Sequence, residues 1–464
     1  MINLSIVDYA ILIGYFVLVF AIGFFVKNEQ GDDLENYFLA GRKLTLPLFV
    51  ATLVTTWYGN LLSVGELAFK QGLVMWLTQG LFWYFTYFFV AFFLAEKIHK
   101  TKLFSIPDQL EASYDKATAL LGAGVNLLLM VPAVYILSLA YICELIFGWD
   151  KISCVLVGTL IPLLYMIKGG FKAVVYTDFI QFIFMFLGIA FVIPFAYFKY
   201  GGFEFLTANL PSSHLSLTGE WSWQLILAWF LIAMWAIVHP SFYQRIFASP
   251  DLKTAKQGIL WSIGFWFIFD MMINLVGLYA FAAMPDLEPA TSLLVFSASV
   301  LPVVFKGIFF TGLVATVMST LDSLGFSSAM SVSYDIFLRV KKDLSHKQVI
   351  NINKWALVFI LGLGIIIAIY FESLIELMYV RGTIAISALL VPLLASYFPN
   401  IIASPPRGFS KQSNPRRAGF WSMLAGILGA SLGYFLKQYC GLELEPIFLG
   451  LVLSLLCFVF KQKS

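Results

Sequence analysis

Charged residues are scarce in this chain: only 12% of its 464 residues are Asp, Glu, Lys or Arg, whereas 60% are hydrophobic. An average soluble domain has about 25% charged residues. Hydrocarbon cannot hydrate a charge, so a long chain with so few charges is expected to lie in a lipid bilayer. The net charge of +3 and the lack of a basic block also argue against a nucleic-acid partner.

Cysteine is scarce as well, with four residues in the chain and no C-x-x-C spacing among them. This pattern predicts free thiols rather than a disulfide framework or a metal site. The sequence also has no Walker loop, no H-E-x-x-H and no glycine-rich turn after a strand. We therefore expect a membrane protein that is not an enzyme.

Long apolar runs, by contrast, occur along the whole chain. A helix needs about 20 apolar residues to cross a bilayer, and the first run is too long for a signal-peptide core. The sequence predicts an all-α polytopic membrane protein with about 13 transmembrane helices. Their expected positions are 7–26, 45–69, 73–95, 118–147, 152–168, 178–198, 222–247, 256–284, 299–337, 352–371, 374–398, 418–436 and 441–460. The segment 299–337 is too long for one straight span, so we expect it to bend or to extend past the membrane.

Lys and Arg fall mainly on one side of this arrangement. If the N-terminus faces outside, the inner segments hold most of the 29 Lys and Arg residues, and the outer segments hold Lys151, Lys199 and Lys437. Cytoplasmic loops are enriched in Lys and Arg, and a miscounted helix would destroy this bias. We therefore predict a multi-pass protein of the cytoplasmic (inner) membrane, with its N-terminus outside and its C-terminus in the cytoplasm.

The order of the spans predicts an internal repeat. Spans 2–6 and 7–11 each contain five helices, so the second set enters the membrane from the opposite side, as in an inverted-topology repeat. We expect one transporter domain over 1–464, made of an extra N-terminal helix (1–30), two repeats (44–200 and 220–400) and two C-terminal helices (417–464).

The first helix of each repeat carries an interruption. Thr55–Asn60 lies in the middle of span 2, and His239-Pro240 lies toward the inner half of span 7. An unwound helix that lines a cavity frees carbonyl groups, which can bind a cation. The alternative is an ordinary proline kink or a packing contact between small residues.

A stripe of hydroxyl side chains in span 9 is the strongest candidate for an ion site. Thr316, Ser319, Thr320 and Ser323 follow one another at helical spacing, and Asp322 lies at the edge of the stripe. Hard oxygen atoms suit a hard cation, and an intramembrane carboxylate points to function because it is costly to keep there. Hydroxyls in helices also bond back to the preceding turn or pack closely, which is the structural alternative.

Two further charged side chains are expected inside the membrane. Asp178 opens span 6, either as a cation ligand or as an ordinary helix cap. Arg381 in span 11 either meets a carboxylate of the solute or pairs with Glu372 or Glu376. The candidate solute contacts are Trp57, Gln79, Trp235 and Arg381. Aromatic residues at such positions also serve as interface or packing residues.

Four short motifs occur in a fixed order within residues 5–400. They are Asn36–Arg42, the stretch from Gly169-Gly170 to Asp178 and Gln181, Tyr243-Gln244-Arg245, and Met318–Ser323. Together they resemble the sodium/solute symporter family, which includes sodium–sugar, sodium–proline, pantothenate and sialic acid transporters. The resemblance implies a LeuT-like core, in which ten helices form a five-plus-five inverted repeat.

The resemblance also implies a sodium ion between the break in span 2 and span 9. Its ligands would be the carbonyl of Thr316, the hydroxyls of Ser319 and Thr320, and carbonyls near Leu53 and Thr56. Some family members hold a second cation nearer the cytoplasm. The corresponding residues here are Asp178, Ser319, Asp322 and Ser323.

The function that follows is sodium-coupled symport of a small organic solute into the cell by alternating access. A sugar, an amino acid, a vitamin and a monocarboxylate all remain open as the solute. One alternative is a proton-coupled symporter on the same scaffold, with Asp178 or Asp322 as the proton carrier. The other is a membrane-embedded solute sensor.

Overall fold

Helices account for nearly all of the regular structure in the computed structural model, which describes residues 2–26, 33–370, 374–398, 417–441 and 443–463. The helices are α1 (Ile6–Phe25), α2 (Leu34–Leu39), α3 (Leu46–Trp57), α4 (Leu61–Gln71), η2 (Trp76–Leu81), α5 (Phe82–Phe89), η3 (Val90–Leu94), α6 (Ala95–Thr101), α7 (Ile106–Ser113), α8 (Lys116–Met130), α9 (Ala133–Phe147), α10 (Lys151–Tyr200), α11 (Phe203–Asn209), α12 (Trp223–Ala233), α13 (Trp235–Val238), α14 (Pro240–Ala248), α15 (Leu252–Ala283), α16 (Ser292–Val300), α17 (Phe305–Met330), η6 (Ser331–Leu338), α18 (His346–Tyr370), α19 (Leu374–Ser396), α21 (Ala418–Tyr439) and α22 (Pro446–Lys463). Among them η2, η3 and η6 are π-helices.

Ten helical stretches of the described residues are long and apolar enough to cross a membrane, or up to 11 if the bent pair Leu34–Arg42 and Leu46–Trp57 is one span. All thirteen predicted segments fall on helices. The segment 45–69 is divided between α3 and α4, and two others coincide with the shorter apolar helices Lys151–Ile167 and Pro446–Lys461. The all-helical, multi-pass fold is therefore confirmed, and the count of thirteen spans stays a prediction.

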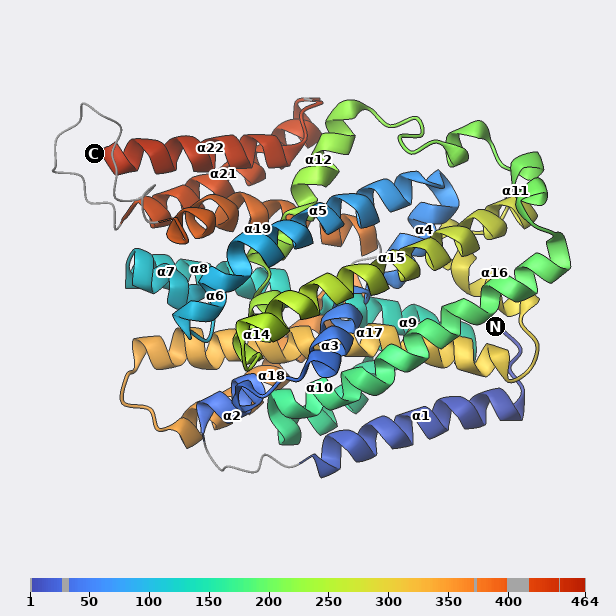
Figure 1. Ribbon diagram of the computed structural model, residues 1–464, viewed down its shortest axis with the longest axis horizontal. Coiled ribbons are helices and arrows are strands. Elements are labelled where there is room, and N and C mark those ends of the chain that lie inside the picture. Colours follow the sequence, from blue (N-terminus) through green and yellow to red (C-terminus); the bar gives the residue numbers. More distant parts are fainter. Residues whose placement is uncertain (1, 27–32, 371–373, 399–416, 442, 464) are drawn as a thin grey trace.

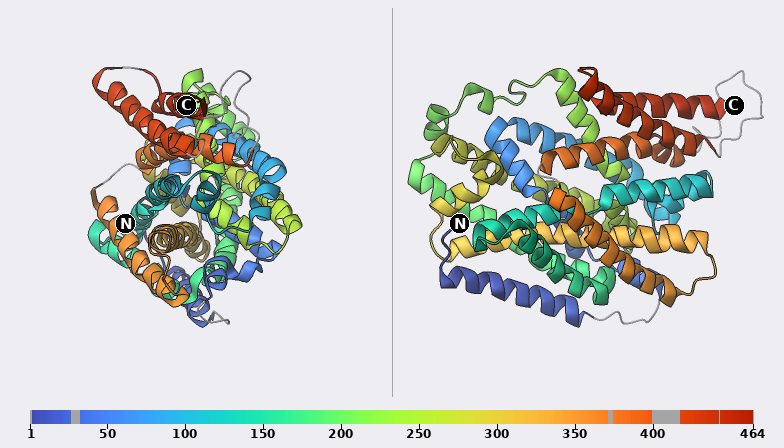
Figure 2. Two further views of the ribbon diagram at one scale, coloured as in Figure 1. Left: turned by 90° about the vertical axis from the view of Figure 1, so that its left-hand side faces the viewer. Right: turned by 180° about the vertical axis from the view of Figure 1, so that it is seen from behind.

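The long helices run roughly parallel to one axis of the molecule (Figure 1). Helix α1 lies at one edge of the bundle, and α21 and α22 lie at the opposite edge. Viewed along the bundle, α17 lies inside a ring of other helices (Figure 2). The two ends of the chain lie at opposite ends of the bundle in both figures, which agrees with an odd number of crossings.

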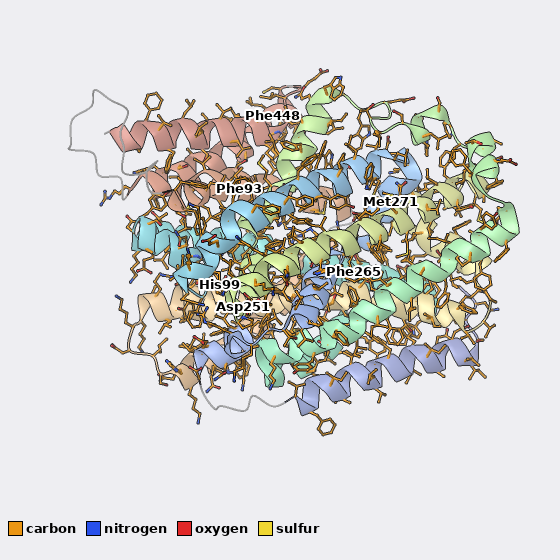
Figure 3. All side chains as sticks on the ribbon, viewed as in Figure 1. Phe93, His99, Asp251, Phe265, Met271 and Phe448 are labelled. Carbon is orange, nitrogen blue, oxygen red and sulfur yellow. The ribbon has the colours of Figure 1, made fainter. Side chains whose placement is uncertain are left out.

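The outward faces of the bundle are apolar. Phe93 is 58% exposed on the face shown in Figure 3, and Phe359 (67%) and Phe435 (54%) are also exposed. A soluble protein would hide such large side chains, because water penalises contiguous exposed apolar surface. Lipid carries no such penalty, so the surface agrees with a multi-pass membrane protein.

Small residues allow α17 to lie at the centre. The most apolar part of the stretch Phe305–Leu338 is 94% buried. Gly188 of α10 and Gly312 of α17 face each other, because a Cβ added to Gly312 would lie 3.1 Å from the Cα of Gly188. Close approach of helix backbones through glycine is typical of helix packing in membranes.

Span 9 starts later than predicted, because Ser299 and Val300 end α16 and the next helix begins at Phe305. Helix α17 begins at Phe305 and continues through the π-helix η6 to Leu338, which gives 34 residues in one stretch. At 1.5 Å per residue this corresponds to about 50 Å, compared with about 30 Å of hydrocarbon. The stretch therefore extends past the hydrocarbon core.

A single glycine separates two predicted spans within α10. Gly170 has φ 60° and ψ −161°, a backbone conformation that is strained for other residues. A Cβ at this position would also lie 3.0 Å from the ring of Tyr37. The helix has already restarted when it reaches Asp178, which is completely buried. The interpretation of Asp178 as a helix cap is therefore wrong, because the restart lies about two turns earlier.

Candidate functional site

The break in span 2 lies where the sequence predicts it. Helix α3 ends at Trp57 and α4 begins at Leu61, with Tyr58 and Asn60 outside helical geometry. Carbonyl groups in the last turn of a helix lack partners from the next turn. Glycine is needed at the break, because a Cβ on Gly59 would lie 2.5 Å from Oγ1 of Thr320.

The hydroxyl stripe of α17 faces this break. Oγ of Ser319 and Oγ1 of Thr320 each lie 3.1 Å from the carbonyl oxygen of Thr55. The same hydroxyls lie 2.9 Å and 3.3 Å from the carbonyl oxygen of Thr316. Four oxygen atoms from two helices therefore form one cluster. The hydroxyls also bond back within their own helix, as the structural alternative predicts, and the ion site stays a prediction.

The structure brings one unpredicted residue, Thr55, into contact with the hydroxyl stripe, and it shows where the hydroxyl of Thr56 points. The carbonyl that the hydroxyls reach is that of Thr55, which lies between the expected Leu53 and Thr56. The side chain of Leu53 is part of the apolar core. The hydroxyl of Thr56 turns toward Ser323, 2.9 Å away. A sequence motif cannot reveal which carbonyl faces α17, because this depends on the register of the helix break.

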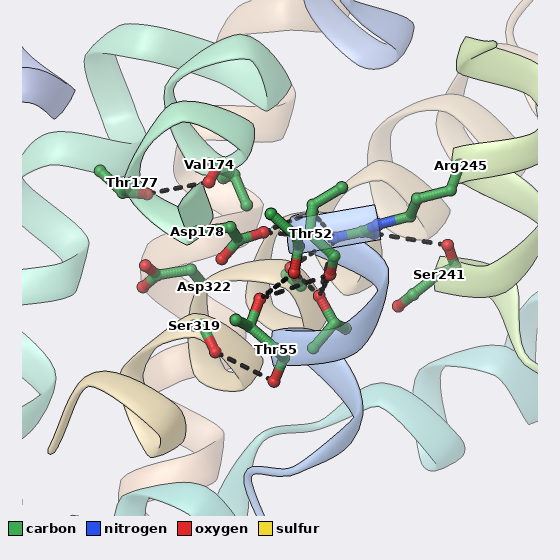
Figure 4. A network of polar contacts seen from close by, with 12 residues as sticks. Thr52, Thr55, Val174, Thr177, Asp178, Ser241, Arg245, Ser319 and Asp322 are labelled. Carbon is green, nitrogen blue, oxygen red and sulfur yellow. Dashed lines mark hydrogen bonds and ion pairs between the residues drawn. The ribbon is translucent and has the colours of Figure 1, made fainter. Parts of the chain in front are cut away.

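The predicted second cation site contains the side chain of Arg245. Its Nη2 atom donates to the hydroxyls of Ser323 (2.6 Å), Thr52 (2.9 Å) and Thr56 (2.9 Å). The same atom lies 3.7 Å from a carboxylate oxygen of Asp178, and both side chains are completely buried. Figure 4 shows the guanidinium reaching from α14 toward Thr52 and Asp178.

The two predicted carboxylates have different partners. The hydroxyl of Thr52 donates to Asp178, and the hydroxyl of Tyr165 donates to Asp322. Asp322 is also completely buried, and it is close enough to Asp178 for an electrostatic interaction. Asp178 therefore faces a cation of the chain itself, whereas Asp322 faces a neutral phenol.

The break in span 7 positions Arg245. His239 has extended backbone geometry, and α14 restarts at Pro240, where proline is favoured because its missing N–H needs no partner. One turn later, Nε2 of Gln244 donates to the carbonyl of Phe38 at 2.9 Å. The four motifs singled out in the sequence therefore meet around Gln244 and Arg245.

A hollow lies beside the break in span 2. About 620 Å³ of space free of protein atoms belongs to it, a volume that includes open solvent at its mouth. Its lining consists of Thr56, Trp57, Tyr58, Asn60, Val64, Gln79, Trp83, Tyr84, Tyr87, Tyr135, Trp235, His239, Trp266, Asp270 and Met378. Three of the four predicted solute contacts belong to this set, namely Trp57, Gln79 and Trp235.

The fourth predicted contact, Arg381, is not among the described lining residues. Its Nη1 atom donates to the carbonyl of Val131 at 2.6 Å. The alternative partners Glu372 and the side chain of Glu376 lie outside the described residues. Its guanidinium also interacts with Tyr135, which lines the hollow, so Arg381 lies next to the hollow without belonging to its described lining.

Asp270 was not predicted as part of the site. Its two carboxylate oxygens accept hydrogen bonds from the hydroxyls of Tyr58 and Tyr84, and it is 1% exposed. The signal in the sequence was an acidic residue within an apolar span without a local partner.

Two broken helices that enclose a polar cluster and a hollow near the middle of a membrane bundle define a secondary transporter. The family model described as "Sodium:solute symporter family" matches residues 37–402. The chain therefore belongs to the sodium:solute symporter family. The prediction of a sodium-coupled symporter for a small solute is confirmed at the level of this family.

Curated relatives agree with this assignment. The chain is 24% identical to the sodium/pantothenate symporter of Escherichia coli over 480 residues, which cover 97% of this chain and 95% of that protein. It is 25% identical to the sodium/glucose cotransporter 4 of Danio rerio over 424 residues. That match covers 78% of this chain and 63% of the fish protein, so the chain spans less than two thirds of that relative.

Solved structures share the fold. A sodium-coupled sialic acid symporter in a substrate-bound outward-open state superposes with a TM-score of 0.83 at 18% identity, covering 99% of this chain and 98% of that chain. Mhp1, a nucleobase-cation-symport-1 family transporter in a closed conformation, gives a TM-score of 0.52 at 11% identity, covering 92% and 89%. The predicted LeuT-like fold class is thus confirmed.

Proposed function

We propose that this chain carries a small organic solute into the cell together with sodium by alternating access. The sodium ion is held by the carbonyls of Thr55 and Thr316 and the hydroxyls of Ser319 and Thr320. The carbonyls of Leu53 and Thr56 flank Thr55 and remain predicted ligands. Transport rather than catalysis is the proposed activity.

The observation that carries this proposal is the pair of 3.1 Å contacts from Ser319 and Thr320 to the carbonyl of Thr55. These contacts connect the broken helix to α17 through oxygen atoms alone. Carbonyls of an unwound helix coordinate sodium in transporters of this architecture. A sodium ion at this position stabilises the arrangement in which the two helices meet, and it shifts the equilibrium by its difference in affinity for the two states.

The solute site is proposed in the hollow beside the break. Trp57 and Thr56 belong to its lining, and both lie next to Thr55 in the chain. Sodium that fixes Thr55 against α17 therefore also fixes one wall of the solute site. This shared segment is the proposed physical basis of coupling.

For the second predicted cation site, we propose that Arg245 is the resident cation. Its guanidinium already donates to Ser323 and lies against Asp178, which are two of the four predicted ligands. A sodium ion at the same place would face the repulsion of that positive charge. One sodium ion per solute is the resulting stoichiometry.

The remaining proposals concern placement in the membrane. We propose a cytoplasmic membrane, with the N-terminus outside and the C-terminus in the cytoplasm, because Lys and Arg concentrate on one side. The opposite positions of the two chain ends support this (Figure 1). The proposed repeats, 44–200 and 220–400, would then move against each other during transport.

Thermal unfolding of the purified protein in NaCl, with KCl as the control, tests the sodium site. A ligand that binds the folded state alone raises the unfolding temperature saturably. We expect sodium to do so in the wild type, and Ser319→Ala to abolish the effect. Ser138→Ala is the matched control, because Ser138 is also buried and bonds to a carbonyl of its own helix, that of Val134. Equal effects of the two salts on the wild type would overturn the proposal, and uptake driven by a proton gradient would then be the next measurement.

A further inference from the structure

The walls of the solute hollow are mainly aromatic. Eight of its fifteen lining residues are Trp or Tyr, and the ring centroids of Trp57 lie 5.5 Å from Trp83 and 5.9 Å from Tyr87. Tyr87 lies 4.2 Å from Trp266. The faces of such rings carry partial negative charge and attract cations. An aromatic enclosure of this kind suits a solute with a positive group.

The same hollow contains a carboxylate. Asp270 is the one Asp or Glu among the described lining residues, and that set includes neither Lys nor Arg. Tyr58 and Tyr84 donate hydrogen bonds to it, but a phenol adds no positive charge. A buried carboxylate without a cationic partner is costly. A cationic solute supplies the missing charge.

Unpaired donors in the lining indicate a second property of the solute. Nε2 of Gln79 and Nε1 of Trp235 are buried and have no hydrogen-bond partner in the described part of the chain. Buried donors are normally paired, and leaving one unpaired costs about 1–3 kcal/mol. A solute that also carries an oxygen acceptor satisfies them.

We propose that the solute of this transporter is a small organic ammonium compound that also carries a hydroxyl or carboxylate oxygen, and is therefore a cation or a zwitterion. The ammonium group lies among the aromatic rings near Asp270, and the oxygen accepts from Gln79 or Trp235. The proposal rests on the proposed function, because it places the solute in the same hollow. It also disfavours a purely anionic solute, since Asp270 would repel it.

A pair of solutes with equal shape and different charge tests this proposal. Choline and 3,3-dimethylbutan-1-ol have the same size, but the second has a carbon atom in place of the charged nitrogen. Both are added to the purified full-length protein at a fixed NaCl concentration, and the affinity is read from the saturable rise in unfolding temperature. Ethanolamine, a second cation, and glycine betaine, a zwitterion, extend the series of ammonium compounds, and pantothenate and glucose represent other classes.

We expect at least one of the three ammonium compounds to bind about tenfold more tightly than the neutral alcohol. Asp270→Asn should remove this preference and leave the stabilisation by sodium alone intact. Asp251→Asn is the matched control, because Asp251 is exposed at the start of the same helix α15. Tyr84→Phe keeps the carboxylate and removes one donor, so cation affinity should persist even if Asp270→Asn fails to fold.

Two results would overturn the proposal. One is that the neutral alcohol, glucose or pantothenate binds as tightly as the best ammonium compound. The other is that none of the ammonium compounds binds at up to about 10 mM although sodium stabilises the protein, because so weak an affinity does not fit a specific solute site. In the second case the sodium site stands and the solute class alone is wrong. If sodium has no effect either, the proposed function itself fails.

Discussion

Arg245 and Asp178 form a buried ion pair at the centre of the membrane bundle, with Nη2 of the arginine 3.7 Å from Oδ2 of the aspartate. The pair connects α14, which follows the break in span 7, to the second half of α10. The guanidinium carbon also lies 5.0 Å from the centroid of the Phe171 ring. The arginine therefore joins α14 to two positions of α10, a helix far from α14 in the sequence.

The first prediction concerns the stability of this pair. Removing one partner leaves an uncompensated buried charge, which costs about 3–5 kcal/mol. We expect Arg245→Gln and Asp178→Asn each to lower the unfolding temperature strongly. The double variant, which buries no net charge, should recover part of the loss. Thermal unfolding of the four proteins measures the coupling between the two residues, and additive losses would show that the pair does not interact.

The second prediction concerns sodium stoichiometry. With Arg245 as the resident cation, the dependence of wild-type stability on sodium concentration should have a Hill coefficient of about one. Arg245→Ala leaves Asp178 and Ser323 free to bind a second small cation, so the coefficient should rise toward about two. Arg417→Ala is the control, because Arg417 is exposed at the start of α21. A coefficient of about two in the wild type would contradict the role of Arg245.

The third prediction concerns the helix break. An added methyl group on Gly59 would collide with Thr320 and with the ring of Tyr135, and would push the break away from α17. Gly59→Ala should weaken sodium binding about tenfold or more, since the oxygen cluster needs both helices. Gly264→Ala in α15 is the control, because no atom lies within 4 Å of the added Cβ. Equal sodium affinities of the two variants would disprove this role of Gly59.

The fourth prediction concerns orientation. Cys440 is exposed and follows α21, on the side that the distribution of Lys and Arg places outside. A membrane-impermeant maleimide should therefore label Cys440 in intact cells, because an accessible thiol reacts through its thiolate. Cys440→Ser should abolish the labelling. A cysteine introduced at the exposed Asp343 in that variant should react after permeabilisation alone, and labelling of it in intact cells would invert the topology.

Much of the fold was predictable because apolar runs and Lys/Arg placement are local signals. Two parts of the site were predictable for the same reason, namely the break between Trp57 and Leu61 and the stripe from Thr316 to Ser323. Each is formed by residues that lie close together in the sequence. The contact between the break and the stripe was predicted from the resemblance to a family. The structure identifies the contacting carbonyl as that of Thr55.

The parts that the sequence did not reveal depend on long-range packing. Asp270 meets Tyr58 and Tyr84 across about 200 residues of chain, with separations of 212 and 186 positions. Arg245 reaches Thr52 across 193 positions. No periodicity or spacing encodes such contacts, because they arise when two repeats of a bundle pack together. The role predicted for Arg381 stays a prediction, since its Nη1 atom donates to Val131 and its guanidinium also interacts with Tyr135, which lines the hollow.

Equilibrium binding of radioactive sodium to the purified protein tests the central claim most directly. The account predicts saturable binding of about one sodium ion per chain, which is lost in the double variant Ser319→Ala/Thr320→Ala and retained in Ser138→Ala. Saturable binding that survives the double variant would place the ion elsewhere. Absence of saturable binding in the wild type would contradict a sodium site between the broken helix and α17.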